Sequence, residues 1–284
     1  MRTRITAEPA APVVAELGEG PVWDVDTEEM VWVDILGRRI HRTDLSNQTT
    51  RTETAPEAVG AVIPADDGWL ATMPEGLYRI GTWERLAELP VTAPHTRAND
   101  GKVDPWGSLV QGTMGWDAEV GAGSLFRLRA DRLEVLLGAL TISNGLDWTE
   151  DGETMYHIDT PTRQVMAYEY RADGPLGTGR VALDLTDAPG YPDGMCLDTD
   201  GCLWVALWGG GRVQRYTPDG RLDRQITVPA TKVSSCAFGG PQLDTLIITT
   251  AHPAGRQHGE LDGRLFVADP GACGRPPNRI GALR

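Results

Sequence analysis

Three oxygen-bearing side chains stand at matching places in the sequence, each directly before a glycine at the start of a short apolar run. They are Glu19, Asn144 and Asp193. Two carboxylates and one amide oxygen suit a hard divalent cation, with water in its remaining coordination positions. Such an open site can polarise a carbonyl group and activate water. Each residue alone is also explained by a local turn, so their shared position is what favours a metal site.

Other polar residues surround a fourth position of the same kind. Asp100 also precedes a glycine, and it either joins the site or braces its own tight turn. Arg97 and Asn99 come just before it and are expected at the mouth of the site, although Arg97 is also explained as a surface cation. Trp116 and Trp208 follow apolar runs and are expected to rim the same pocket.

The signatures of several other chemistries do not occur in the sequence. No serine lies in a G-x-S-x-G nucleophile elbow, no pair of histidines forms HExxH, and no Walker loop is present. The run Gly209-Gly210-Gly211 is interpreted as a hairpin between strands rather than as a phosphate cradle. The oxygen-rich set therefore remains as the candidate site.

A repeat of short strands would position these residues. Six apolar runs open at residues that lie roughly 40–50 positions apart, a period typical of a β-propeller. These residues are Gly20, Gly60, Gly101, Gly145, Gly194 and Ser235. In a propeller, the innermost strand of every blade starts at the central channel. The sequence therefore predicts an all-β, six-bladed β-propeller, a single domain over residues 1–284, with a metal site in the central channel.

The remaining strands follow from β-branched and aromatic runs. Second strands of the blades are predicted at residues 30–34, 68–72, 108–112, 154–158, 202–206 and 245–249. Third strands are predicted at residues 76–80, 124–128 and 211–216. Asp-Gly turns join several of these pairs. No long amphipathic helix is expected, residues 2–7 are expected to add a strand to the last blade and close the ring, and residues 270–277 form a loop rich in Gly and Pro.

Composition excludes some classes of function. The chain has 284 residues, a formal net charge of −14 and a pI near 4.8. This charge argues against nucleic acid and anionic membranes as partners, and it is compatible either with attraction of a cation or simply with a solvated acidic surface. No run approaches the ~18 apolar residues of a spanning helix, and the start lacks the pattern of a signal peptide. The four cysteines show no metal-type spacing, which favours a reducing cytoplasm. The sequence carries no signal for the oligomeric state.

Several runs in order along the chain resemble the regucalcin/gluconolactonase family, from about residue 17 to residue 268. These runs are LGEGPVW (17–23), RANDGKVDP (97–105), SNGLDW (143–148), YPDGM (191–195) and SSCAFGG (234–240). The resemblance implies a six-bladed propeller with one divalent metal in the channel and hydrolysis of sugar lactones. It implies metal ligands at Glu19, Asn144 and Asp193, and substrate contacts at Arg97 and Asn99.

Three departures from the family pattern bear on the identity of the sugar. Asp117 stands where the family usually has a glutamate that contacts the substrate, so its side chain is one methylene shorter. Ala98 stands where the family often has a bulky aromatic residue. The loop at Trp208-Gly209-Gly210 also differs from the common pattern.

The function expected from this resemblance is a cytoplasmic, metal-dependent sugar lactonase that opens a five- or six-carbon lactone to the aldonic acid. The cation is Ca²⁺, Mg²⁺, Mn²⁺, Fe²⁺ or Zn²⁺, since all accept such ligands, and Asp193 is expected to double as the base that takes a proton from the attacking water. Arg97 and Asn99 would orient the substrate. The alternatives are a metal-dependent phosphotriesterase or other esterase, and a non-enzymatic propeller that binds calcium or a protein. A binding module would not require Arg97 and Asn99 beside the metal.

Overall fold

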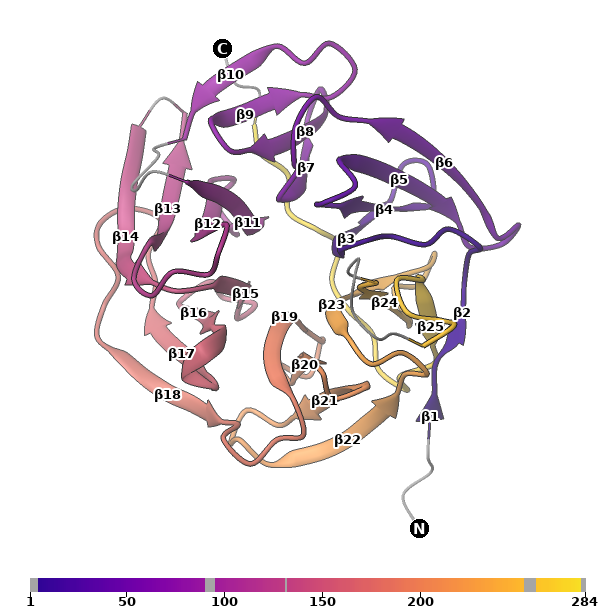
Figure 1. Cartoon of the computed structure of the whole chain (residues 1–284). Helices are drawn as coiled ribbons and strands as arrows, with labels where there is room; N and C mark the ends of the chain where they lie inside the picture. The colour runs from indigo at the N-terminus through magenta and orange to yellow at the C-terminus, as the bar shows by residue number, and fades with distance from the viewer. Residues whose placement is uncertain (1–4, 90–94, 131, 253–258, 282–284) are drawn as a thin grey trace.

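The chain folds into six sheets arranged around a central axis (Figure 1). The computed structural model describes residues 5–89, 95–130, 132–252 and 259–281. The expected all-β, six-bladed propeller is confirmed. Within these residues the only helical element is one 3-10 turn, η1 (Thr160–Thr162). None of the described helices is long and apolar enough to cross a bilayer.

Every blade has four strands, ordered here from the axis outward. Blade 1 is β3 (Gly18–Asp24), β4 (Glu29–Asp34), β5 (Arg39–Asp44) and β6 (Thr49–Thr54), and blade 2 is β7 (Ala61–Ala65), β8 (Gly68–Met73), β9 (Gly76–Arg79) and β10 (Arg85–Glu88). Blade 3 is β11 (Thr96–Val103), β12 (Leu109–Gly115), β13 (Gly123–Arg129) and β14 (Arg132–Leu140), and blade 4 is β15 (Ser143–Trp148), β16 (Thr154–Asp159), β17 (Gln164–Glu169) and β18 (Gly179–Asp184). Blade 5 is β19 (Tyr191–Leu197), β20 (Leu203–Trp208), β21 (Arg212–Tyr216) and β22 (Leu222–Thr227), and blade 6 is β23 (Val233–Gly239), β24 (Thr245–Thr250), β25 (Phe266–Ala268) and β2 (Glu8–Pro9).

The innermost strands β3, β7, β11, β15, β19 and β23 are those that the sequence repeat predicts. The predicted second and third strands are also confirmed, within one or two residues at their ends. The three glycines at 209–211 lie in the turn between β20 and β21, as expected. Gly152 and Gly201 follow aspartates in tight turns and have φ of 73° and 74°, a conformation that glycine adopts without steric strain.

The core lies between neighbouring blades, because each sheet is covered on both faces. Strand β20 shows this well, since Trp204, Val205 and Ala206 are all fully buried although successive side chains point to opposite faces. One cluster joins residues of blades 4 and 5, among them Ile158 and Leu203. The outer strands β6 and β14 are mostly exposed, which explains why their sequences are polar or mixed.

The ring closes in a different way from the one expected. Strand β1 (Ile5–Thr6) pairs in parallel with β22 of blade 5, and it is β2, two residues further on, that completes blade 6 by pairing with β25. The expectation that residues 2–7 complete the last blade is therefore wrong for Ile5 and Thr6, and residues 2–4 lie outside the described residues. The first two strands have two residues each, too few to show a periodic pattern.

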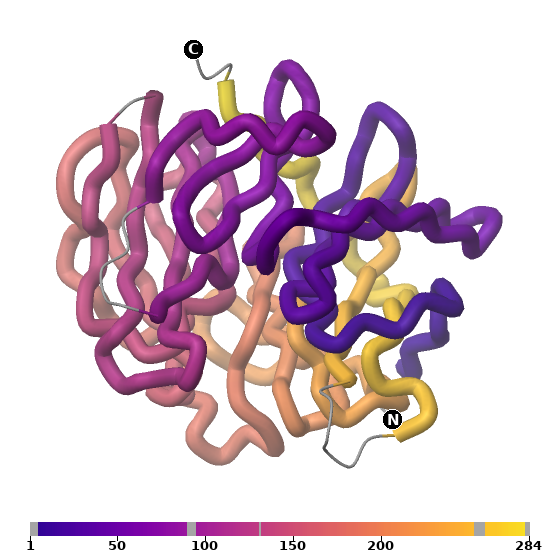
Figure 2. Tube along the Cα trace, turned by 45° about the horizontal axis from the view of Figure 1, so that its top comes forward, coloured from indigo at the N-terminus to yellow at the C-terminus, as the bar shows by residue number. Residues whose placement is uncertain are grey.

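The C-terminal segment, residues 269–281, crosses the channel at one end. It leaves blade 6, appears pale behind the inner strands in Figure 1, and reaches the second blade in Figure 2, where Ile280 bridges Ala65. Hydrogen bonds attach it to three blades on the way, from Arg275 to the Trp148 carbonyl, from Asn278 to the Val103 carbonyl and from the Ile280 amide to the Pro64 carbonyl. This loop thus closes the channel at that end.

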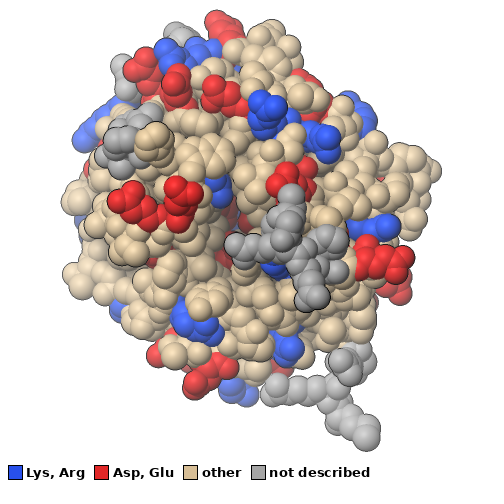
Figure 3. Space-filling view, viewed as in Figure 1, with Lys and Arg blue, Asp and Glu red and all other residues tan. Residues whose placement is uncertain are grey.

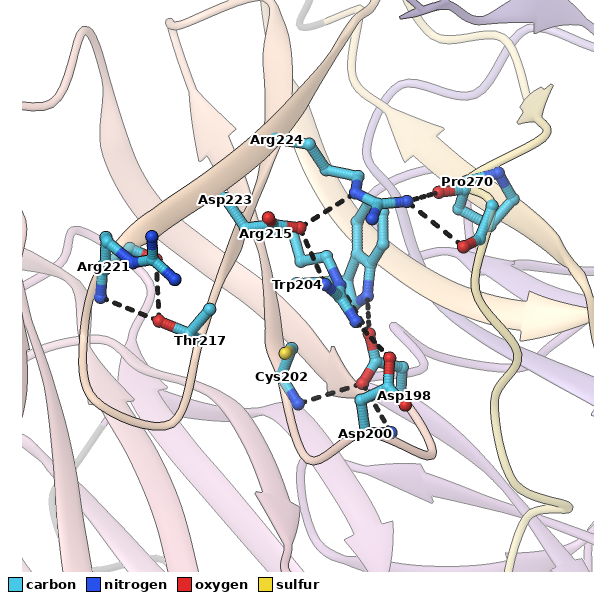
Figure 4. Close-up of polar contacts among 11 residues, drawn as sticks. Asp198, Asp200, Cys202, Trp204, Arg215, Thr217, Arg221, Asp223, Arg224 and Pro270 are labelled. Atoms are coloured by element: carbon cyan, nitrogen blue, oxygen red, sulfur yellow. Dashed lines mark hydrogen bonds and ion pairs between the residues drawn. The ribbon is translucent and has the colours of Figure 1, made fainter. Parts of the chain in front are cut away.

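A charged network anchors the same segment to blade 5 (Figure 4). The buried Asp198 carboxylate accepts a hydrogen bond from the Arg215 guanidinium at 2.7 Å, and Arg215 also pairs with Asp223 at 2.7 Å. Arg224 pairs with the same Asp223 at 2.9 Å and donates to the Pro270 carbonyl at 2.6 Å. Because each buried charge is paired, the network can stay in the fold without a large desolvation cost.

Candidate functional site

The inner strands are bulged at the level of the predicted site. Pairing of β3 with β4 shifts register after Glu19, that of β15 with β16 after Asn144, and that of β19 with β20 around Asp193. Strands β11 and β23 are interrupted at the same level, whereas β7, which has no polar residue there, pairs with β8 without a break. A bulge re-aims a side chain out of the regular pleat. These bulges distinguish the strands that carry polar residues from the strand that does not.

The glycine after each polar residue is required by the close approach of neighbouring inner strands. A Cβ atom on Gly145 would lie 2.6 Å from the Asp193 carbonyl oxygen, and one on Gly194 would lie 2.1 Å from Ser235 Oγ. Both distances are too short for real contacts, so only glycine fits. The same approach brings Asn144 and Asp193 to adjacent positions on two blades.

Hydrogen bonds connect the polar residues of blades 3 and 4. Arg97 Nη1 donates to Asn99 Oδ1 at 2.7 Å, and Asn99 Nδ2 donates to Asn144 Oδ1 at 2.8 Å. Asn99 Nδ2 also donates to the Ser143 carbonyl at 2.8 Å, so both of its amide protons are used. The contacts that the structure gives Asn99 are therefore those of a residue that orients Asn144.

Thr160 of η1 holds the other end of the Asn144 amide. Its Oγ1 accepts a hydrogen bond from Asn144 Nδ2 at 2.8 Å and donates to the Pro192 carbonyl at 2.9 Å. Because the nitrogen of the amide is held by Thr160, the oxygen is left on the side of Asn99, with a lone pair still open. Pro192 directly precedes Asp193, so one hydroxyl links the positions of Asn144 and Asp193.

The carboxyl groups of the site lie close enough to repel one another. Burial, and then the charge of Asp100, raise the pKa of Glu19 from 4.5 to about 8, against the opposing effects of the Gly20 amide and Arg97. Burial, and then the charges of Glu19 and Asp100, raise the pKa of Asp193 well above its usual range, and Arg97 lowers it. Burial also lowers the pKa of Arg97 to about 10, against the attraction of Glu19 and Asp193. One buried guanidinium thus faces several carboxyl groups.

Asp100 connects this group with the channel beyond it. Burial raises its pKa to about 6, while Lys102 lowers it and Asp147 raises it. Lys102 itself pairs with Asp147 at 3.2 Å and is thereby already partly neutralised. Asp100 therefore belongs to the electrostatic environment of Glu19 and Asp193, in addition to accepting a hydrogen bond from the Gly101 amide at 2.8 Å as expected for a turn.

The residues fit a hard divalent cation. Asp193 Oδ1 is buried, and no donor within the described part of the chain hydrogen-bonds to it. A buried carboxylate without a partner is costly, and a cation would remove both that cost and the repulsion from Glu19. Asn144 adds a neutral oxygen, a ligand type that Ca²⁺ and similar ions accept. The described residues contain no group of three or more His, Cys, Asp or Glu side chains that could hold a metal, so the set depends on the Asn144 amide.

The predicted substrate residues lie in two settings. Arg97 is buried, and its guanidinium lies over the ring of Trp116, 5.6 Å from the centroid. Trp116 is 45% exposed and Asp117 is exposed in the same turn after β12, so this turn lies above Arg97 but outside the buried cluster. Trp208 is partly buried, and Lys232 lies over its ring at 5.5 Å. Figure 3 shows acidic and basic side chains interspersed on the face opposite the C-terminal segment.

Two members of the site lay beyond the reach of the sequence pattern. Thr160 sits in a short turn between β16 and β17 and does not share the repeat position of the other residues. Ser143 contributes a backbone carbonyl, which no side-chain pattern reveals. The Pro161 that follows Thr160 favours the first turn of a helix and was the available local signal, but it predicts a turn and not a contact.

Comparisons with known proteins agree with this architecture. The family described as SMP-30/Gluconolactonase/LRE-like region matches residues 17–252. A 6-deoxy-6-sulfogluconolactonase from Pseudomonas putida is 38% identical over 242 residues, covering 83% of each chain. The pentonolactonase XacC from Haloferax volcanii is 37% identical over 276 residues, covering 93% of this chain and 94% of that protein. Among solved structures, the calcium-binding protein regucalcin from Agrobacterium tumefaciens matches with a TM-score of 0.90 and 29% identity, covering 99% of this chain and 98% of that one.

Proposed function

This chain belongs to the SMP-30/gluconolactonase/LRE-like family, and from that premise we propose that it is a metal-dependent lactonase that opens a sugar lactone to its aldonic acid. Two relatives that it matches over most of its length are named as lactonases of sugar acids. The observation that carries the proposal is the unpartnered, buried Oδ1 of Asp193 beside Glu19 and Asn144. An uncompensated carboxylate at a channel bulge is what a cation site requires.

Glu19, Asn144 and Asp193 would hold the cation. When bound, a divalent ion supplies polarisation of the lactone carbonyl and lowers the pKa of a coordinated water. Ca²⁺, Mg²⁺, Mn²⁺, Fe²⁺ and Zn²⁺ are all compatible with this donor set, and the calcium-binding name of the matched regucalcin structure supports Ca²⁺ as the first ion to test.

Arg97 and the turn above it would bind the sugar. The Arg97 guanidinium is buried beside the carboxyl groups and would donate to a ring hydroxyl or to the lactone oxygen. Trp116 offers an exposed ring that can stack on the apolar face of a sugar. Asp117, exposed in the same turn, would reach only the hydroxyls farthest from the ring ester. Asn99 would act mainly by orienting Asn144, with a smaller part in binding substrate.

Asp193 would take the proton of the attacking water. Its Oδ1 accepts no hydrogen bond from the described residues, so this oxygen is open to a proton. After attack, the ring C–O bond breaks, the former ring oxygen receives a proton, and the product is the open hydroxy acid. The proton accepted by Asp193 is the nearest source for that oxygen.

We place the enzyme in the cytoplasm, and the observation that supports this is that all four cysteines are free thiols. The alternative of an esterase or phosphotriesterase uses the same donor set with a less polar substrate. The buried Arg97 favours a polar, hydroxyl-rich substrate over that alternative. A calcium-binding propeller without enzymatic activity would leave Arg97 without a task beyond charge neutralisation.

The proposal is tested with a panel of five- and six-carbon aldonolactones, a phosphotriester and an aryl ester, followed by acid release at constant pH. The expected result is metal-stimulated hydrolysis of at least one aldonolactone above its spontaneous rate, and loss of that rate in Asn144→Ala at the same metal concentration. Faster turnover of the aryl ester or phosphotriester than of any lactone would favour the alternative enzymes. Binding of metal without turnover of any compound would favour the non-enzymatic propeller.

A further inference from the structure

Two thiols that the proposed reaction does not use meet between blades 5 and 6. Cys196 of β19 and Cys236 of β23 are both buried, and their Sγ atoms are 3.8 Å apart. We propose that Cys196 and Cys236 form a dithiol that a small peroxide oxidises to an intramolecular disulfide, which cross-links the inner strands of these two blades. This modification site is independent of the lactonase proposal.

The backbones of β19 and β23 already approach each other at this level. A Cβ atom on Gly194, two residues before Cys196, would lie 2.8 Å from the Cα of Ser235, the residue before Cys236. A disulfide has an S–S length of ~2.05 Å and needs a short Cα–Cα separation of ~4.4–6.8 Å. The sulfurs therefore have to move together by less than ~2 Å, between strands that are already in contact.

A cavity gives a small oxidant access to the pair. The part of the channel between the candidate site and the C-terminal segment contains a cavity of about 170 Å³. Its walls include both thiols, two charged side chains and two prolines of the C-terminal segment, namely Cys196, Cys236, Lys102, Asp147, Pro276 and Pro277. Since a water molecule occupies ~30 Å³, the cavity has room for about five waters and hence for hydrogen peroxide.

The charges in the cavity affect the reactivity of Cys196. Burial, and then the contact with Cys236, raise the pKa of the Cys196 thiol, whereas the nearby Lys102 ammonium lowers it. Lys102 is held in place by Asp147 at 3.2 Å and by the Met195 carbonyl at 3.3 Å. We therefore expect slow oxidation at neutral pH and faster oxidation at mildly alkaline pH, where more thiolate forms.

The reaction is balanced with peroxide as the oxidant. The Cys196 thiolate attacks one peroxide oxygen, the O–O bond breaks, and the products are a sulfenic acid and one water. The Cys236 sulfur then attacks the sulfenic sulfur, the S–O bond breaks, and a second water leaves. The two thiols together lose two electrons and two hydrogen atoms, and the peroxide is reduced to two waters.

The other two cysteines serve as internal controls. Cys202 is buried beside Asp198 and has no sulfur partner at bonding distance among the described residues, and Cys273 is exposed in the C-terminal segment. Because exposed Cys273 would react on its own, the experiment uses Cys273→Ser, which leaves three thiols.

The test is to treat folded Cys273→Ser with excess hydrogen peroxide at mildly alkaline pH, denature it, and count thiols. The expected count falls from three to one, the chain loses two hydrogen atoms in mass, and a peptide map links Cys196 to Cys236. Dithiothreitol should restore all three thiols. In a second variant that also carries Cys202→Ser, the count should fall from two to zero.

Three results would overturn the proposal. They are a count that stays at three while the protein remains folded, a linkage that joins any other pair, and oxidation that dithiothreitol does not reverse. Cys236→Ala in the same background should keep its remaining thiols out of a disulfide. If that variant does not fold, the peptide map of the Cys273→Ser chain still decides the question.

Discussion

Removal of metal should make the stability of the fold depend on pH through Glu19. Burial and Asp100 raise its pKa from 4.5 to about 8, so the folded protein keeps a proton that the unfolded chain releases above its usual pKa. The contribution of protonated Glu19 is fully present below about pH 4.5 and is lost as pH rises through about 8. The difference of 3.5 pKa units, at ~1.36 kcal/mol each, amounts to about 5 kcal/mol.

The variant that isolates this effect is Glu19→Gln, which stays neutral at every pH. Without metal, wild type and variant should have similar free energies of unfolding near pH 4.5, and the variant should be more stable by about 5 kcal/mol above pH 8. At ~2 °C per kcal/mol for a chain of this size, the two melting temperatures should separate by about 10 °C. The comparison must be a difference, because buried His41 and His157 have pKa values lowered to about 4 and stabilise the fold as pH rises towards 6.5.

The assay is thermal unfolding by circular dichroism in EDTA from pH 4.5 to 8.5 for both proteins. Saturating divalent metal should remove most of the wild-type loss, because a bound cation favours the charged form of Glu19. Parallel pH profiles for wild type and Glu19→Gln, with no separation at high pH, would refute the reasoning about burial and repulsion.

Four further substitutions separate metal binding from turnover. Thr160→Val should lower metal affinity by ~10–100-fold in titration calorimetry, because the Asn144 amide loses its anchor, while Thr160→Ser and the exposed-site control Thr162→Val should not. Asn99→Ala should also weaken metal binding, and an unchanged affinity would assign Asn99 to the substrate instead. Arg97→Ala should lower kcat/KM on the best lactone by more than it lowers metal affinity, and wild-type values on every lactone would remove it from the site. Asp193→Asn should lose at least ~100-fold in kcat at saturating metal, and a near wild-type rate would leave Asp193 as a ligand only.

The fold could be predicted because its repeat has a steric cause. Gly145 and Gly194 recur at one phase since the inner strands of neighbouring blades touch there and no Cβ fits. The same cause makes the polar residues before them, Asn144 and Asp193, converge. The two-residue strand at Ile5 and Thr6 could not be assigned, because its partner is set by where the chain enters the ring and not by local pattern. That residues 1–284 unfold as one domain stays a prediction.

The site could be predicted only in part. Residue types and spacing select Glu19, Asn144 and Asp193, but the orientation of the Asn144 amide depends on Thr160, which lies outside the repeat. The use of both Asn99 amide protons is likewise a three-dimensional fact. The exposure of Asp117 follows from its turn after β12, whereas the family resemblance alone suggested a direct contact with substrate.

Metal titration of lactone hydrolysis tests the central claim most directly. Protein stripped with EDTA would be assayed for acid release from its best aldonolactone while a divalent metal is added back. The account predicts that hydrolysis above the spontaneous rate is absent from the stripped protein, returns in proportion to added metal, and saturates at one ion per chain. Full activity of the stripped protein, or the same metal response in Asn144→Ala, would contradict it.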